Sequence, residues 1–197
     1  MKITRARAAA ALVLLIIAAA AIVNYYLAPK PITSWDYRGN TVNFRVDLRE
    51  ADKVPVYPHE TGVYLDIMHP LVQNITIAFK DAGSSENPYY VVEEFEIINK
   101  MRIAYGYILG TKTESGYIAS QDIPTFNAIE VSSYENLPGK IQNPIIALVH
   151  PVYANETSVR NEGHVTVISG KTPHEFDLAV AKFLMVILDI ELADQNL

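Results

Sequence analysis

The 197-residue chain contains no cysteine, and this absence excludes several kinds of protein at once. Disulfide frameworks, thiolate nucleophiles, Cys-ligated zinc sites and a lipid-modified cysteine all require that residue. Stability must therefore come from a hydrophobic core. The composition can supply one, because half of the residues are apolar and only 19% are charged. The length suits one domain of ordinary size.

The chain also lacks an excess of basic residues over acidic ones. The chain has 16 lysines and arginines against 22 aspartates and glutamates, and its formal net charge is −6. Because Lys2, Arg5 and Arg7 all lie at the N-terminus, the remaining chain is more acidic still. Proteins that bind nucleic acid neutralise phosphates with a basic surface, so this balance argues against a nucleic-acid partner.

Common catalytic and metal-binding motifs are also missing. The five histidines never occur as H-x-x-x-H or H-E-x-x-H, so we expect no metal site. No G-x-S-x-G nucleophile elbow is present, and a triad of Ser84 or Ser169 with His150 and Asp81 has no motif to support it. The sequence therefore predicts no cofactor and assigns no catalytic residue.

Near the N-terminus, an unbroken apolar run extends from Ala8 to Val23 and continues to Ala28. At about 1.5 Å per residue, a helix over residues 8–28 spans the hydrocarbon core of about 30 Å. Basic residues precede the run, so the positive-inside rule places the N-terminus in the cytoplasm and the rest of the chain outside. We expect these residues to contact the lipid bilayer as a single-pass anchor. The alternative is a cleaved signal peptide, for which Ala18-Ala19-Ala20 offers a site.

The remaining chain divides into a linker and one domain. Residues 29–40 contain Pro29 and Pro31 and are predicted to form a short extended spacer, and residues 41–197 an extracytoplasmic α/β domain. Apolar residues alternate with polar ones from Thr41 to Leu48, which predicts an edge strand. The stretch from Val63 to Met68 fits either a short helix or a strand.

Compact apolar runs predict three buried strands and one weaker candidate at Phe126–Val131. A helix is expected between Asn87 and Gly110, and a second helix after the capping box that begins at Thr172. The same cap and a turn at Gly170 account for the sequence Gly-Lys-Thr, which lacks the upstream glycines of a phosphate-binding loop. The three strands are Asn74–Phe79, Ile145–Val149 and Val165–Ile168. The apolar face of the first helix is predicted to contain Val91, Phe95, Ile98, Met101, Tyr105 and Ile108, and that of the second Phe176, Ala179, Val180, Phe183, Leu184 and Ile187.

This alternation of strands and helices predicts an open, mostly parallel α/β (Rossmann-like) domain with helices packed on its faces. Ligands of such sheets lie beyond the carboxyl ends of the strands. The loops that follow the predicted strands supply the candidate binding residues, which are Asp81, His150, Asn155 and His174.

Two N-glycosylation sequons, at Asn74 and Asn155, fall in the part predicted to lie outside the cell. Asn155 follows a strand in a polar loop and is the better acceptor. Asn74 opens a buried strand, so we expect it to remain unmodified.

Towards the C-terminus, an apolar strand runs into a turn with a nearby asparagine, and a second strand ends at a glycine before an alanine-containing helix. These segments are residues 144–149, 150–155, 165–170 and 176–181. In this order of elements, residues 143–192 resemble the C-terminal module of archaeal surface-layer and cell-wall-binding proteins, and of uncharacterised membrane-anchored archaeal proteins. His150 stands where that pattern has a pair of glycines. The resemblance implies an envelope-associated protein without catalysis.

Together, these features predict a membrane-anchored cell-surface protein that makes non-catalytic contacts with envelope or surface-layer components. The alternative is an extracytoplasmic enzyme or small-ligand-binding protein that uses the loops around His150 and His174. A cluster of histidine and carboxylate side chains in a pocket at the strand ends would favour the alternative.

Overall fold

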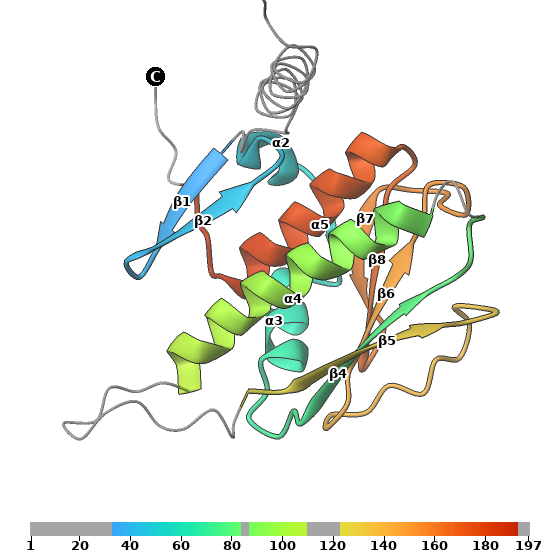
Figure 1. Cartoon of the computed structure of the whole chain (residues 1–197), viewed down its shortest axis with the longest axis horizontal. Coiled ribbons are helices and arrows are strands. Elements are labelled where there is room, and N and C mark those ends of the chain that lie inside the picture. Colours follow the sequence, from blue (N-terminus) through green and yellow to red (C-terminus); the bar gives the residue numbers. More distant parts are fainter. Residues whose placement is uncertain (1–32, 84–86, 110–122, 193–197) are drawn as a thin grey trace, which may run out of the picture. The chain divides into compact units, whose positions relative to one another are not determined.

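The computed structural model describes residues 33–83, 87–109 and 123–192 (Figure 1). Contacts divide the chain into Met1–Pro31 and Ile32–Leu197, and the described residues all belong to the second unit. The predicted anchor at residues 8–28 lies outside them. Within the part that the structure describes, no helix is both long and apolar enough to cross a membrane.

A six-stranded, mostly parallel sheet organises the domain (Figure 1). Strands β8, β6, β4 and β5 run parallel to one another, β7 is antiparallel to β8, and β3 is parallel to β7. The prediction of a mostly parallel α/β sheet is confirmed, with β6 between two parallel neighbours as expected. In spatial order the strands are β3 (Val56–Tyr57), β7 (Ser158–Asn161), β8 (Val165–Ser169), β6 (Ile145–Val149), β4 (Asn74–Phe79) and β5 (Thr125–Glu130).

The longer helices pack on one face of this sheet, whereas the sequence predicted helices on its faces generally. Ile77, Leu148 and Ile168 share the main core with residues of all three helices. On the opposite face, Ala78 and Ala147 lie with the larger Ile145 and Val165 in a second, smaller cluster. Apolar side chains of the segment 131–137, which is neither helix nor strand, cover this cluster. The helices are α3 (Glu60–Ile67), α4 (Asn87–Leu109) and α5 (Pro173–Ile187).

Helix α5 is the element that local sequence predicts best. The Thr172 hydroxyl accepts a hydrogen bond from the Glu175 amide at 3.2 Å, as the capping box requires. The predicted apolar face is buried throughout. A Cβ atom at Gly170 would lie 2.2 Å from the Phe176 nitrogen, so the close approach of the first helical turn requires glycine. The explanation of residues 170–172 as a turn and a cap is confirmed.

Residues 33–40, expected to belong to an extended spacer, form a hairpin instead. Strand β1 (Thr33–Tyr37) pairs antiparallel with β2 (Asn40–Phe44) in a separate two-stranded sheet. Arg38 and Gly39 form the turn with φ of 52° and 86°, the positive values that tight hairpin turns require.

The strand expected from Thr41 to Leu48 is shorter than its alternation suggested. Val42, Phe44, Val46 and Leu48 are all buried, as the alternation predicted. The strand nevertheless ends at Phe44, because the Asp47 side chain accepts a hydrogen bond from the Arg49 amide at 2.9 Å and begins α2 (Leu48–Ala51).

The buried face of α4 differs from the prediction. Met101 and Tyr105 are buried as expected, but Val91 and Phe95 are 64% and 66% exposed. The helix is rotated so that a different set of side chains faces the interior: Tyr90, Glu93, Ile97, Lys100 and Ala104. Two charged residues take the place of the predicted apolar ones, and the site described below explains how they are accommodated. The side chain of Ile108 lies outside the described part.

Candidate functional site

The carboxyl ends of β4 and β6 form the candidate site, because the chain leaves these neighbouring strands in opposite directions. After β4 it passes through α4 to β5, and after β6 it continues to β7 and β8 on the other side. Open α/β sheets bind ligands where the onward connections of adjacent strands diverge in this way. The loops that carry Asp81 and His150 meet at this point, as the sequence predicted.

A tyrosine hydroxyl separates the two strands where they diverge. The Tyr134 hydroxyl accepts a hydrogen bond from the Lys80 amide at 2.9 Å and donates one to the Leu148 carbonyl oxygen at 2.6 Å. The last paired residues of the two strands are Phe79 and Leu148. The hydroxyl thus satisfies backbone groups that a longer β-ladder would pair directly.

Tyr90 extends this hydrogen-bond chain to His150. Its hydroxyl accepts a hydrogen bond from the His150 amide at 3.2 Å and lies 3.4 Å from the Tyr134 hydroxyl. Because the Tyr134 proton is directed to Leu148, Tyr90 is the donor between the two hydroxyls. Burial raises the pKa of Tyr90, and also that of Tyr134, so both phenols remain protonated near neutral pH.

The imidazole of His150 is built into the same edge, and the residue is only 3% exposed. Its Nδ1 accepts a hydrogen bond from the Val152 amide at 3.3 Å, which assigns the proton of the neutral ring to Nε2. The ring centroid lies 5.4 Å from that of Tyr90 and 6.1 Å from that of Tyr89. His150 is therefore packed among aromatic rings, where it positions the loop.

The loops after β4 and β6 are fastened to each other above this layer. The Tyr153 hydroxyl donates a hydrogen bond to the Asp81 carbonyl oxygen at 2.6 Å, and the Lys80 ammonium lies 4.3 Å from the centroid of the Tyr153 ring. The Asp81 carboxylate accepts from the Gly83 amide at 2.9 Å and so stabilises its own turn.

The other predicted residues lie away from this cluster. Asn155 is exposed in the loop between β6 and β7. His174 is exposed in the first turn of α5, with its Nε2 3.4 Å from a Glu50 carboxylate oxygen. Asn74 accepts a hydrogen bond from the Thr125 hydroxyl on the neighbouring strand. The structure therefore brings Asp81 and His150 to one edge and gives His174 a different side-chain partner.

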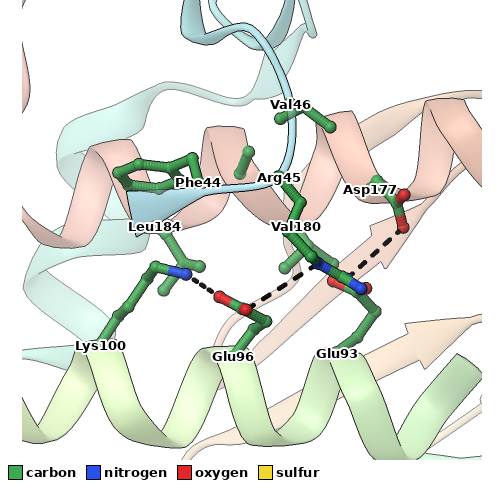
Figure 2. A pocket seen from close by; sticks show the side chains of 10 residues that line it. Phe44, Arg45, Val46, Glu93, Glu96, Lys100, Asp177, Val180 and Leu184 are labelled. Carbon is green, nitrogen blue, oxygen red and sulfur yellow. Dashed lines mark hydrogen bonds and ion pairs between the residues drawn. The ribbon is translucent and has the colours of Figure 1, made fainter. Parts of the chain in front are cut away.

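A second polar cluster, which the sequence did not predict, lies between β2, α4 and α5 (Figure 2). The Arg45 guanidinium forms an ion pair with Glu93 and lies 3.9 Å from carboxylate oxygens of Glu96 and Asp177. The Lys100 ammonium pairs with Glu96 and lies 4.8 Å from the centroid of the Phe44 ring. We call these five charged residues the hairpin clamp, because they connect the β1–β2 hairpin to both helices.

Burial shifts the pKa values within the hairpin clamp. It raises the pKa of Glu93 to about 7 and lowers that of Lys100 to about 8. Arg45 partly offsets the shift of Glu93, whereas Asp177 adds to it. The space between the side chains is about 20 Å³, which is room for a water molecule at most. The clamp is therefore a structural ion-pair network and leaves no space for a substrate.

Among the residues that the structure describes, no group of three or more histidine, aspartate or glutamate side chains could hold a metal ion. Comparison with protein-family models, with curated proteins and with solved structures finds no match. The function has to be inferred from the geometry of the domain itself.

Proposed function

We propose that this chain is a membrane-anchored cell-surface protein whose Rossmann-like domain makes non-catalytic contacts with envelope or surface-layer proteins. The apolar run at residues 8–28 and the basic residues before it support the anchor and the outward orientation of the domain. One structural observation carries the proposal of protein contacts, namely the exposure of apolar side chains on the first turns of α4 and in the loop after β6, two segments that meet where Tyr89 contacts His150. We call these side chains the apolar edge surface, which is defined by Tyr89, Val91, Val92, Phe95, Val152 and Tyr153.

The apolar edge surface combines the first turns of α4 with the loop after β6. Val91, Phe95 and Val152 are 64%, 66% and 63% exposed. The contact between the rings of Tyr89 and His150 places the helix beside that loop. Single exposed apolar residues are ordinary, but several exposed aromatic and aliphatic side chains on two adjoining segments are typical of sites where proteins bind one another.

The side chains beneath this surface favour a protein contact over a small ligand bound between the strand ends. Tyr90 and Tyr134 occupy the point where the strands diverge, and their hydroxyls are used by backbone groups and by each other. An enzyme that used His150 together with His174 would need these rings near one reacting group. His150 contacts tyrosine rings, whereas His174 faces Glu50.

Protease treatment of intact cells, with mass spectrometry of the released peptides, tests the proposed location. Release of peptides from residues 40–197 while residues 1–28 stay in the membrane fraction would support it. Protection of those peptides in intact cells, with cleavage after lysis, would overturn it.

The contact itself is tested by a photo-crosslinking residue placed at Phe95 in the cell. We expect adducts with an envelope protein at this position, and no such adducts from the matched position Leu65, which is 58% exposed on α3. Equal adducts from both positions, or none from Phe95, would contradict a specific contact at the apolar edge surface.

A further inference from the structure

Strand β5 lies at the end of the sheet, and the described residues include no strand that pairs with its outer side. The Thr125 amide donates to the Gln73 carbonyl oxygen and the Val131 amide to that of Phe79, so odd-numbered residues face β4. Because backbone groups alternate along a strand, the N–H and C=O groups of Phe126, Ala128 and Glu130 point outward.

In the described residues, the outer edge of β5 has no proline, lysine or bulge that would hinder pairing with another strand. Natural edge strands are blunted by proline, lysine, bulges or short length. Thr125–Glu130 has the sequence TFNAIE and pairs in unbroken register with β4 along its whole length. Every residue of β5 except Phe126 is exposed, and Ile129 is 41% exposed. Within the part of the chain that the structure describes, the edge is therefore available to a partner strand.

We propose that β5 pairs antiparallel with β5 of a second copy of this chain, about a two-fold axis that passes between the two copies of Ala128, so that the two sheets become one. In an antiparallel pair, directly opposed residues point to the same face. A two-fold axis that keeps the helices of both copies on one face must therefore place a residue opposite its own copy, and not opposite the residue next to it. Only Ala128 and Asn127 allow most of the strand to pair.

Hydrogen bonding selects Ala128 between these two positions. With the axis at Ala128, Phe126 lies opposite Glu130 of the partner subunit, and every outward-facing N–H and C=O group of β5 finds a partner. With the axis at Asn127, the outward N–H groups still find acceptors, but the Glu130 carbonyl lies opposite Pro124 of the partner subunit, which has no N–H to donate.

Charge complementarity identifies the occupant as a second copy. The Arg102 guanidinium lies 5.8 Å from the centroid of the Phe126 ring, on the helical face of the sheet. Glu130 projects from the same face of β5 but is four residues further along the strand, about 13 Å away. Pairing of Phe126 with Glu130 of the partner subunit brings that carboxylate to Arg102. The two-fold axis repeats the ion pair, as an isologous interface requires.

The absence of cysteine from the natural sequence makes a direct test possible. In the full-length chain in its own membrane, the variant Ala128→Cys places two thiols opposite each other on either side of the proposed axis. Opposed residues of a hydrogen-bonded antiparallel pair have Cα atoms about 5.5 Å apart, which suits a disulfide. We expect Ala128→Cys to form a disulfide-linked dimer at least about tenfold faster than Leu65→Cys, a control on exposed α3.

Charge variants separate specific pairing from chance collision. In the Ala128→Cys background, Arg102→Glu should slow dimer formation several-fold, and the added change Glu130→Arg should restore it. Faster cross-linking of Asn127→Cys than of Ala128→Cys would overturn the proposed register. Cross-linking of Ala128→Cys no faster than that of Leu65→Cys would overturn the dimer itself.

Discussion

The Tyr134 hydroxyl lies 2.6 Å from the Leu148 carbonyl oxygen, and it also accepts a hydrogen bond from the Lys80 amide. Tyr134, in the segment after β5, thereby joins the ends of β4 and β6, from which the chain continues in opposite directions. The candidate site is consequently a hydrogen-bonded layer of side chains that fixes the loops above it.

Removal of that hydroxyl in Tyr134→Phe should destabilise the domain. The variant leaves the Lys80 amide and the Leu148 carbonyl without their partner, and an unsatisfied buried polar group costs about 1–3 kcal/mol. Urea unfolding followed by the fluorescence of Trp35, the single tryptophan, measures the change. Tyr153→Phe is the matched control, because it removes one hydrogen bond of a 36% exposed residue. Equal stability of the two variants would refute the bridging role of Tyr134.

The orientation of α4 gives a second prediction. Phe95 is 66% exposed and Ile97 is fully buried. Phe95→Ala should therefore change the free energy of unfolding by no more than about 0.5 kcal/mol. Ile97→Ala should lower it by about 2–5 kcal/mol, because it leaves a cavity in the core. If Phe95→Ala instead lowered the free energy of unfolding more than Ile97→Ala, the buried face of α4 would be the one that the sequence pattern predicted.

The buried face of α4 was predicted wrongly, because the pattern of apolar residues within a helix does not report its partners from other elements. Helix α5 was predictable because its cap and its apolar period lie within the helix itself. The buried face of α4 contains Glu93 and Lys100, and the burial of Glu93 depends on Arg45, which is 48 residues away along the chain. No periodicity within the helix can report a counter-charge that arrives from another element.

The same limit applies to the site. The rule for strand ends correctly joined the loops of Asp81 and His150, because it needs only the parallel sheet. Tyr134 was missed, since the segment 131–143 has neither helical nor strand periodicity. The short antiparallel strand β7 was missed for a related reason, as four residues are too few to display a pattern. The turn at Arg38-Gly39 was the available signal for the hairpin.

Close packing at the start of α5 leads to a third prediction. A Cβ atom at Gly170 would meet the backbone of Phe176 and Glu175 at 2.2–2.5 Å, and backbone cannot move aside as a flexible side chain can. Gly170→Ala should lower stability by about 1–3 kcal/mol or more. Gly106→Ala is the control, because a methyl group at Gly106 in α4 would meet nothing within 4 Å. Helix propensity predicts a gain of up to about 1 kcal/mol there. Thermal unfolding measures both variants. A lower melting temperature for Gly170→Ala, with an unchanged or higher one for Gly106→Ala, would support the close contact at Gly170.

The hairpin clamp predicts how stability depends on pH. Burial raises the pKa of Glu93 from 4.5 to about 7 in the folded chain, so the folded state binds more protons than the unfolded state between these values. The contribution of Glu93 to stability is therefore fully present below about pH 4.5 and is lost as the pH rises through 7. Lys100 acts at higher pH. Its pKa falls from 10.5 to about 8, so its contribution is present above 10.5 and is lost as the pH falls through 8.

Urea unfolding between pH 5 and pH 7.5 isolates the contribution of Glu93. The variant Glu93→Gln keeps the shape of the side chain and removes its titration. The stability of the natural chain should fall more steeply over this interval than that of Glu93→Gln. Glu162→Gln, a change at an exposed carboxylate in the turn between β7 and β8, should leave the slope unchanged. Parallel curves for the natural chain and Glu93→Gln would mean that Arg45 keeps Glu93 ionised throughout. In that case the clamp would hold the hairpin equally well across the whole interval.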